Sequence, residues 1–119
     1  MDKITFKTKN TFEDRRSESE KINNKYPHRV PIIVEKCDKS TLVDIDKNKF
    51  LVPRDLNMNQ FVYIIRKRIK LDKSQSIFLM VNGSLCPSNT PISVIYEDHK
   101  DKDGFLYMTY AGENTFGCL

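Results

Sequence analysis

The spacing of apolar positions predicts its strongest helix over residues 57–71. Phe61, Ile65 and Ile69 recur there at helical spacing, and Asn57 stands where its side chain can cap the first turn. Cations gather at the C-terminal end of this stretch, where they suit the helix dipole. We therefore expect one well-formed amphipathic helix near the middle of the chain.

A second helix, predicted within residues 10–26, has a weaker apolar pattern. Thr11 is a capping residue with Asp14 three positions later, and Pro27 ends the helix. Because its apolar positions are sparse, we expect this helix to pack lightly on the outside of the core.

Several stretches rich in β-branched and aromatic residues predict strands. Asn82-Gly83 is the strongest short hairpin signal in the chain, and Pro31 indicates a strand start or a sheet edge. The predicted strands cover residues 28–36, a segment ending at Pro53, residues 76–81 and residues 105–110.

A short helix is predicted before the last strand, with Thr90 as its N-cap and Pro91 as its first residue. The element order is then helix, hairpin, helix, strand, short helix, strand. This order predicts an α+β fold that fits the ubiquitin-like β-grasp, with additional N-terminal helices packed on the sheet core. We expect residues 1–26 to form the N-terminal helical extension and residues 27–116 the ubiquitin-like domain.

Composition and charge narrow the class of protein. With 119 residues, 39% hydrophobic and 30% charged, the chain suits one globular domain. Its longest apolar run, SIFLMV, is too short to cross a bilayer, and MDKITFKTKN lacks the apolar region of a signal peptide, so we expect a cytoplasmic protein. Residues 26–75 hold eleven Lys and Arg against six Asp and Glu, which favours an acidic partner there.

The residues offer little for catalysis or metal binding. His28 and His99 are the only histidines, and neither has a nucleophile or carboxylate at motif spacing. The three cysteines form no CxxC pair, and no nucleotide-binding or zinc-protease motif occurs. We therefore expect no enzyme, no cofactor and no metal site, although a Cys-His pair assembled in space stays open as an alternative.

The basic segment IIRKRIK admits three interpretations. Charge counting alone favours a solvated helix face. A nucleic-acid patch is the second, but interleaved aromatics and an RNP-like signature are missing, so we expect no nucleic-acid partner. The third is a docking surface for an acidic protein or for anionic lipid headgroups.

The segment KNKFLVP is more informative, because charges at its start and a proline at its end are typical of a sheet edge. Alternation places Lys49 and Leu51 on one face and Phe50 and Val52 on the other. Such an edge could accept an extended peptide by strand addition. Periodicity alone favours the simpler interpretation that these apolar side chains fill the core.

Six segments carry a resemblance that runs from about Phe6 to Gly117 and so covers nearly the whole chain. They are FEDRRSESEKI, KYPHRVPIIVEK, IDKNKFLVP, FVYIIRKRIKL, KDKDGFLYMTY and GENTFG. In this order they resemble the autophagy-related protein 8 family of ubiquitin-like modifiers, which includes GABARAP.

The resemblance implies a life cycle centred on the C-terminus. A cysteine protease would cleave after Gly117, so that residues 117–119 would be the processing site and removable tail. Activating and conjugating enzymes would then join the glycine carboxylate to phosphatidylethanolamine on autophagosomes and other autophagic membranes. Glycine suits these enzymes because a backbone without a Cβ can pass through narrow clefts and adopt angles that other residues cannot. An unconjugated soluble adaptor of the same fold stays open as the alternative.

The resemblance also implies a two-pocket site for cargo receptors and adaptors, whose motif has an aromatic and an aliphatic residue three positions apart, usually beside acids. Backbone groups of Lys49 and Leu51 would pair with the bound peptide. The aromatic pocket would involve Glu18, Ile22, Pro31, Ile33, Lys49, Leu51 and Phe105. The aliphatic pocket would involve Phe50, Val52, Pro53, Phe61, Ile64 and Ile65. The acidic flank would be attracted by Arg29, Lys47, Lys49 and Arg68.

Overall fold

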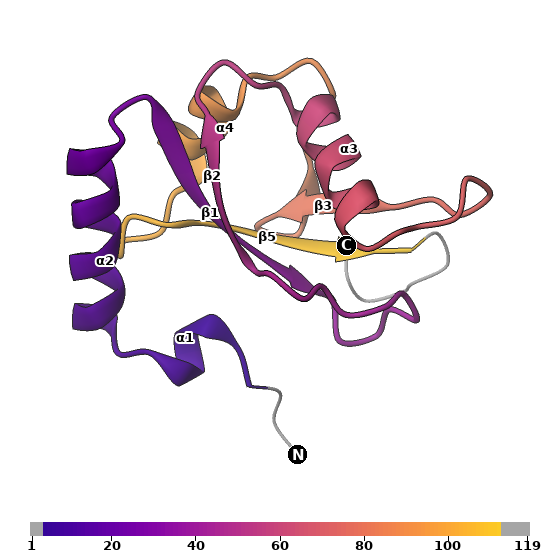
Figure 1. The fold of residues 1–119 in the computed structure, drawn as a ribbon, viewed down its shortest axis with the longest axis horizontal. Coiled ribbons are helices and arrows are strands. Elements are labelled where there is room, and N and C mark those ends of the chain that lie inside the picture. The colour runs from indigo at the N-terminus through magenta and orange to yellow at the C-terminus, as the bar shows by residue number, and fades with distance from the viewer. Residues whose placement is uncertain (1–3, 113–119) are drawn as a thin grey trace.

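The computed structural model describes residues 4–112, which form a five-stranded mixed sheet accompanied by helices (Figure 1). The strand order is β2-β1-β5-β3-β4; β1 and β5 run parallel, and the other neighbours are antiparallel. The predicted α+β class is therefore confirmed. The strands are β1 (Arg29–Lys36), β2 (Lys49–Pro53), β3 (Phe78–Val81), β4 (Ser84–Leu85) and β5 (Leu106–Ala111). The helices are α1 (Phe6–Lys9), α2 (Phe12–Lys25), α3 (Met58–Arg68) and α4 (Ile92–His99).

Strand alternation divides the interior into two clusters. Ile32 of β1 belongs to the larger one, where the sheet packs against α3 and α4 through residues such as Phe61. Its neighbour Ile33 belongs to a smaller cluster with Phe105 and Phe6, under α1 and α2. Because successive side chains of a strand point to opposite faces, the two clusters lie on opposite sides of the sheet.

β2 is an edge strand, as the sequence predicts, whereas β1 lies inside the sheet. Pro31 is tolerated in β1 for two reasons. First, its pair with Leu51 exchanges no ladder hydrogen bonds. The Val34 N–H donates to the Asn48 carbonyl at 2.7 Å, and bonded pairs alternate with non-bonded pairs along the two strands, so the Pro31–Leu51 pair is a non-bonded one. Pairing of β1 with β5 also begins only at Ile32, so no strand on that side needs a donor from the proline.

Local signals in the sequence predicted several element ends. The Thr11 side chain accepts a hydrogen bond from the Asp14 N–H at 3.1 Å and caps α2. Asn57 caps α3 in the same way. Asn82 and Gly83 both have positive φ, 52° and 77°, as a type I′ turn between β3 and β4 requires.

The predicted start of α4 is wrong by one residue. Pro91, and not Thr90, occupies the N-cap position, with extended backbone angles and no side-chain cap hydrogen bond. The Thr90 carbonyl accepts the Met58 N–H at 3.0 Å, and Pro91 forms a bridge with Asn57. This pairing with the start of α3 holds the chain extended, so the helix begins at the next residue.

Candidate functional site

β2 has a backbone edge that faces away from the sheet. The residues that exchange hydrogen bonds with β1 alternate along the strand, and Asn48, directly opposite Val34, is one of them. Lys49 and Leu51 fall between the bonded residues. Their backbone N–H and C=O groups therefore point to the open edge of the sheet.

Residues predicted for the aromatic pocket meet on the α2 face of the sheet. Ile33 and Phe105 are fully buried, and Ile22 of α2 packs against them. Phe6 of α1, which sequence reasoning missed, covers the group; its ring centroid lies 5.2 Å from that of Phe105, edge to face. Pro31 is buried and Leu51 half-buried, and both share this face by register.

An ion pair between Glu18 of α2 and Lys49 of β2 stands beside this group. Both side chains are 36% exposed, so the pair is accessible while it links the helix to the edge strand. The same two residues line a hollow of about 530 Å³ that is bounded on its other sides by α1 and β1. Lys49 also lies over the Phe6 ring, at 5.7 Å from its centroid.

Residues predicted for the aliphatic pocket divide into buried and exposed side chains. Ile64 is 37% exposed and lines a hollow of about 430 Å³ along α3, and Pro53 is exposed at the end of β2. The others are part of the larger core, as periodicity alone favoured. These buried residues are Phe50, Val52, Phe61 and Ile65.

The predicted cations around β2 contact other groups of the chain. Arg68 forms two bonds with the Asp46 carboxylate, at 2.8 and 3.3 Å, which tie the end of α3 to the loop before β2. The Lys47 ammonium lies 5.3 Å from the centroid of the Phe50 ring. These exposed contacts leave the positive charges accessible to an acidic partner.

Arg29 reaches the open edge of β2 directly. It lies opposite Pro53 in the β1–β2 register, and so shares a face with Leu51, one side-chain pair along. Its Nη1 donates a 3.0 Å hydrogen bond to the Leu51 carbonyl oxygen. The acceptor is thus one of the backbone groups that face away from the sheet.

Two further cations of the IIRKRIK segment have local structural contacts, which favours the interpretation as a solvated helix end. Arg66 donates to the carbonyls of Gln75 (2.8 Å) and Asp72 (3.2 Å), holding the loop after α3. Lys67 lies over the ring of Tyr63, 4.7 Å from its centroid.

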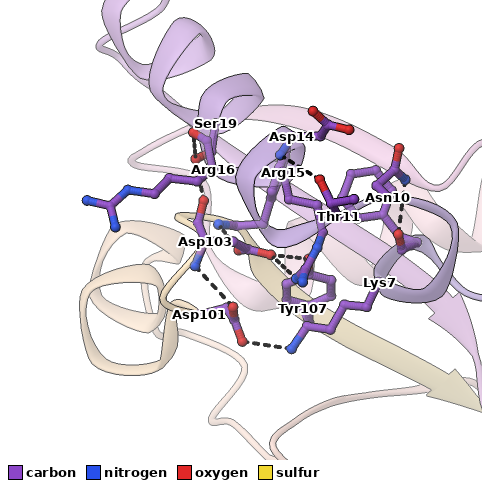
Figure 2. A network of polar contacts seen from close by, with 12 residues as sticks. Lys7, Asn10, Thr11, Asp14, Arg15, Arg16, Ser19, Asp101, Asp103 and Tyr107 are labelled. Atoms are coloured by element: carbon purple, nitrogen blue, oxygen red, sulfur yellow. Dashed lines mark hydrogen bonds and ion pairs between the residues drawn. The ribbon is translucent and has the colours of Figure 1, made fainter.

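A buried polar network fixes α2 on the sheet (Figure 2). Asp103, fully buried before β5, accepts hydrogen bonds from Arg15 Nη1 at 2.6 Å and from the Tyr107 hydroxyl at 2.5 Å. Its other carboxylate oxygen accepts the Phe105 N–H at 2.8 Å, and its carbonyl accepts the Ser19 hydroxyl. The buried face of α2 is therefore polar, which explains its weak apolar pattern.

The residues around this network include a tyrosine with a raised pKa, a glycine with positive φ and a further ion pair. Burial, together with the hydrogen bond to the buried carboxylate, raises the pKa of Tyr107 well above its ordinary value. Gly104 has φ +91°, and a Cβ there would stand 2.3 Å from the Ser19 hydroxyl oxygen. Lys7 of α1 pairs with Asp101 at 2.7 Å, so both N-terminal helices are attached to the loop before β5.

The histidines and Cys86 have ordinary surroundings. His28 is exposed, and Nδ1 of the exposed His99 lies 3.2 Å from the Asn82 amide nitrogen. Burial raises the pKa of the Cys86 thiol, which lowers its thiolate fraction. Within residues 4–112, no group of three or more His, Cys, Asp or Glu could hold a metal ion. No helix in that part of the chain has the length and hydropathy to cross a bilayer.

Comparison with known proteins decides the family. Residues 14–117 match the family model described as "Autophagy protein Atg8 ubiquitin like". The chain belongs to the Atg8 family. It is therefore a ubiquitin-like autophagy protein, in a family of modifiers, and the resemblance drawn from the sequence is confirmed.

Relatives of this family match along nearly the full chain. Autophagy-related protein 8a of Arabidopsis thaliana is 57% identical over 119 residues, covering 100% of this chain and 98% of the relative. Autophagy-related protein 8 of Saccharomyces cerevisiae strain YJM789 is 55% identical over 115 residues, covering 97% and 98%. The crystal structure of Trypanosoma brucei ATG8 superposes with a TM-score of 0.90 at 43% identity, covering 98% of this chain and 100% of that one. The ubiquitin-like fold with N-terminal helices is thus confirmed.

Proposed function

We propose that this chain is a conjugated modifier of autophagic membranes that recruits cargo receptors through the edge of β2. Gly117, the proposed conjugation site, lies outside the described residues. Support for its role comes from the Phe116-Gly117 sequence and from the family match, whose last residue is Gly117. The chain itself would supply the modifier and no catalytic residue.

The proposed chemistry has three steps. A cysteine protease hydrolyses the bond between Gly117 and Cys118, which frees the glycine carboxylate. An activating enzyme uses ATP to convert this carboxylate to a thioester, which a conjugating enzyme carries. The amine of phosphatidylethanolamine then displaces the thiol and forms an amide. The two acyl chains of the lipid hold the protein on the membrane, because a single chain gives only marginal binding.

The open edge of β2, with an apolar group on each side, carries the proposal for receptor binding. Lys49 and Leu51 present backbone groups that β1 does not use, in the direction a new strand would occupy. At this edge the predicted aromatic group lies on the α2 face of the sheet, and the buried members of the predicted aliphatic group lie on the opposite face. In an extended peptide, side chains three positions apart also point to opposite faces. The motif spacing and the geometry of the site therefore agree.

Mass spectrometry of the protein purified from its own starved cells tests the conjugation. We expect a fraction that lacks Cys118 and Leu119 and carries phosphatidylethanolamine on Gly117. The Gly117→Ala variant should stay folded and bind receptor peptide, yet remain off membranes. An intact C-terminus without any lipid adduct would instead favour the unconjugated adaptor.

A further inference from the structure

The contact between Arg29 and Leu51 bears on how the edge of β2 selects a peptide, and this inference rests on the proposed receptor site. The Arg29 side chain is exposed, and its Nη1 donates to the Leu51 carbonyl at 3.0 Å. That carbonyl is one of the backbone groups with which an added strand would pair. The guanidinium thus bonds an oxygen that the peptide backbone would use.

Two distances show that Arg29 and an added strand approach the same carbonyl oxygen. Neighbouring strands in a sheet lie about 4.8 Å apart in the hydrogen-bonding direction. A guanidinium nitrogen 3.0 Å from the Leu51 oxygen lies within that space. A strand added to β2 therefore has to displace the Arg29 side chain or share the Leu51 oxygen with it. In either case the bond between Arg29 and the carbonyl is lost or weakened.

The cost of this movement depends on the peptide. A guanidinium displaced toward a carboxylate exchanges its bond to a carbonyl for a stronger, charge-assisted one. A guanidinium displaced by a neutral peptide returns to water and gains no such partner. We infer that Arg29 is a specificity-determining residue of this edge, which competes with every incoming strand and is compensated only by peptides with an acidic flank.

Lys47 provides a matched comparison, because it is another exposed cation beside β2. Its ammonium lies against the Phe50 ring, 5.3 Å from the centroid, and Lys47 precedes the strand. Lys47 can attract an acidic flank, but it holds no backbone group that the peptide requires. Comparing variants of the two cations therefore separates attraction of the acidic flank from competition for the Leu51 carbonyl.

Calorimetric titration with two synthetic peptides tests the inference. Both carry the aromatic and aliphatic residues three positions apart; one has acidic flanking residues, and the other has the corresponding amides. Arg29→Met should weaken the acidic peptide about threefold and tighten the amide peptide about twofold, the range expected for one exposed ion pair and one exposed hydrogen bond. Lys47→Met should weaken the acidic peptide and, unlike Arg29→Met, should not tighten the amide peptide.

The opposite signs distinguish competition from a structural role. Weaker or unchanged binding of the amide peptide to Arg29→Met would overturn the inference while leaving the receptor site intact. If the wild-type chain binds neither peptide, the receptor site itself is wrong and the inference fails with it. Thermal unfolding of both variants shows whether they are folded at the titration temperature, and nuclear magnetic resonance of the β2 amides reports a local change.

Discussion

At the scale of single residues, the carboxylate of Asp103 holds α2 on the sheet. It is fully buried and joins Arg15 of α2 to Tyr107 of β5, so that a helix with few apolar contacts is still fixed on the sheet. Removing one partner of a buried ion pair is costly because the other charge remains buried without compensation. Glu18 and Ile22, on the same helix, take their place beside β2 as a consequence.

We predict that Asp103→Asn lowers the free energy of unfolding by about 3 kcal/mol, because the Arg15 side chain, only 11% exposed, loses its carboxylate. Urea unfolding at neutral pH measures the change. The control is Glu20→Gln, which removes an exposed ion pair with Arg16 on the same helix and should cost less than about 0.5 kcal/mol. Similar losses in the two variants would show that the buried pair has no special role.

At the scale of elements, β2 is the place where the two layers of the molecule meet. Leu51 faces α2 while Phe50 and Val52 face α3, so a strand added at this edge can contact both layers. Side-chain direction in such a strand depends only on whether the spacing is odd or even. At the proposed receptor site, this arrangement would restrict the sequence of the bound motif.

We predict that inserting one residue between the aromatic and aliphatic positions of a receptor peptide lowers its affinity by about tenfold or more. The even spacing directs both side chains to one face, so one apolar side chain loses its burial, about 1.5–3 kcal/mol. Fluorescence polarisation with labelled peptides measures this. A second inserted residue restores the odd spacing and should recover part of the affinity; a steady loss with length would contradict the two-face geometry.

Local patterns in the sequence predicted most of these elements, and the exceptions have physical reasons. α3 and the hairpin at Asn82-Gly83 were predicted because spacing and turn chemistry act within a few residues. The start of α4 was wrong because a bridge to Asn57, far away in sequence, keeps Pro91 extended. The division of β2 between two faces followed from alternation. The bond between Arg15 and Asp103 could not be predicted, since it joins residues 88 positions apart.

At the scale of the whole molecule, β5 links the two parts of the interior. It lies between β1 and β3, and Tyr110 near its end is fully buried in the larger core. The Tyr110 hydroxyl donates a 2.5 Å hydrogen bond to the Val43 carbonyl and so holds the loop between β1 and β2. Burial raises the pKa of Tyr110 to about 12, and the nearby charge of Asp44 adds to the effect.

The alkaline stability of the fold should therefore depend on this tyrosine. Because the pKa in the folded chain lies above the ordinary value of 10.0, the folded state holds the proton more tightly than the unfolded state. The associated stability is complete below about pH 10 and is lost as the pH rises toward about 12, by up to roughly 1.4 kcal/mol per pH unit. Urea unfolding at a series of pH values measures this slope. Tyr110→Phe should cost about 1 kcal/mol at pH 8 through its lost hydrogen bond, yet show a shallower decline above pH 10. Equal slopes in the two proteins would mean that the alkaline loss arises from other groups.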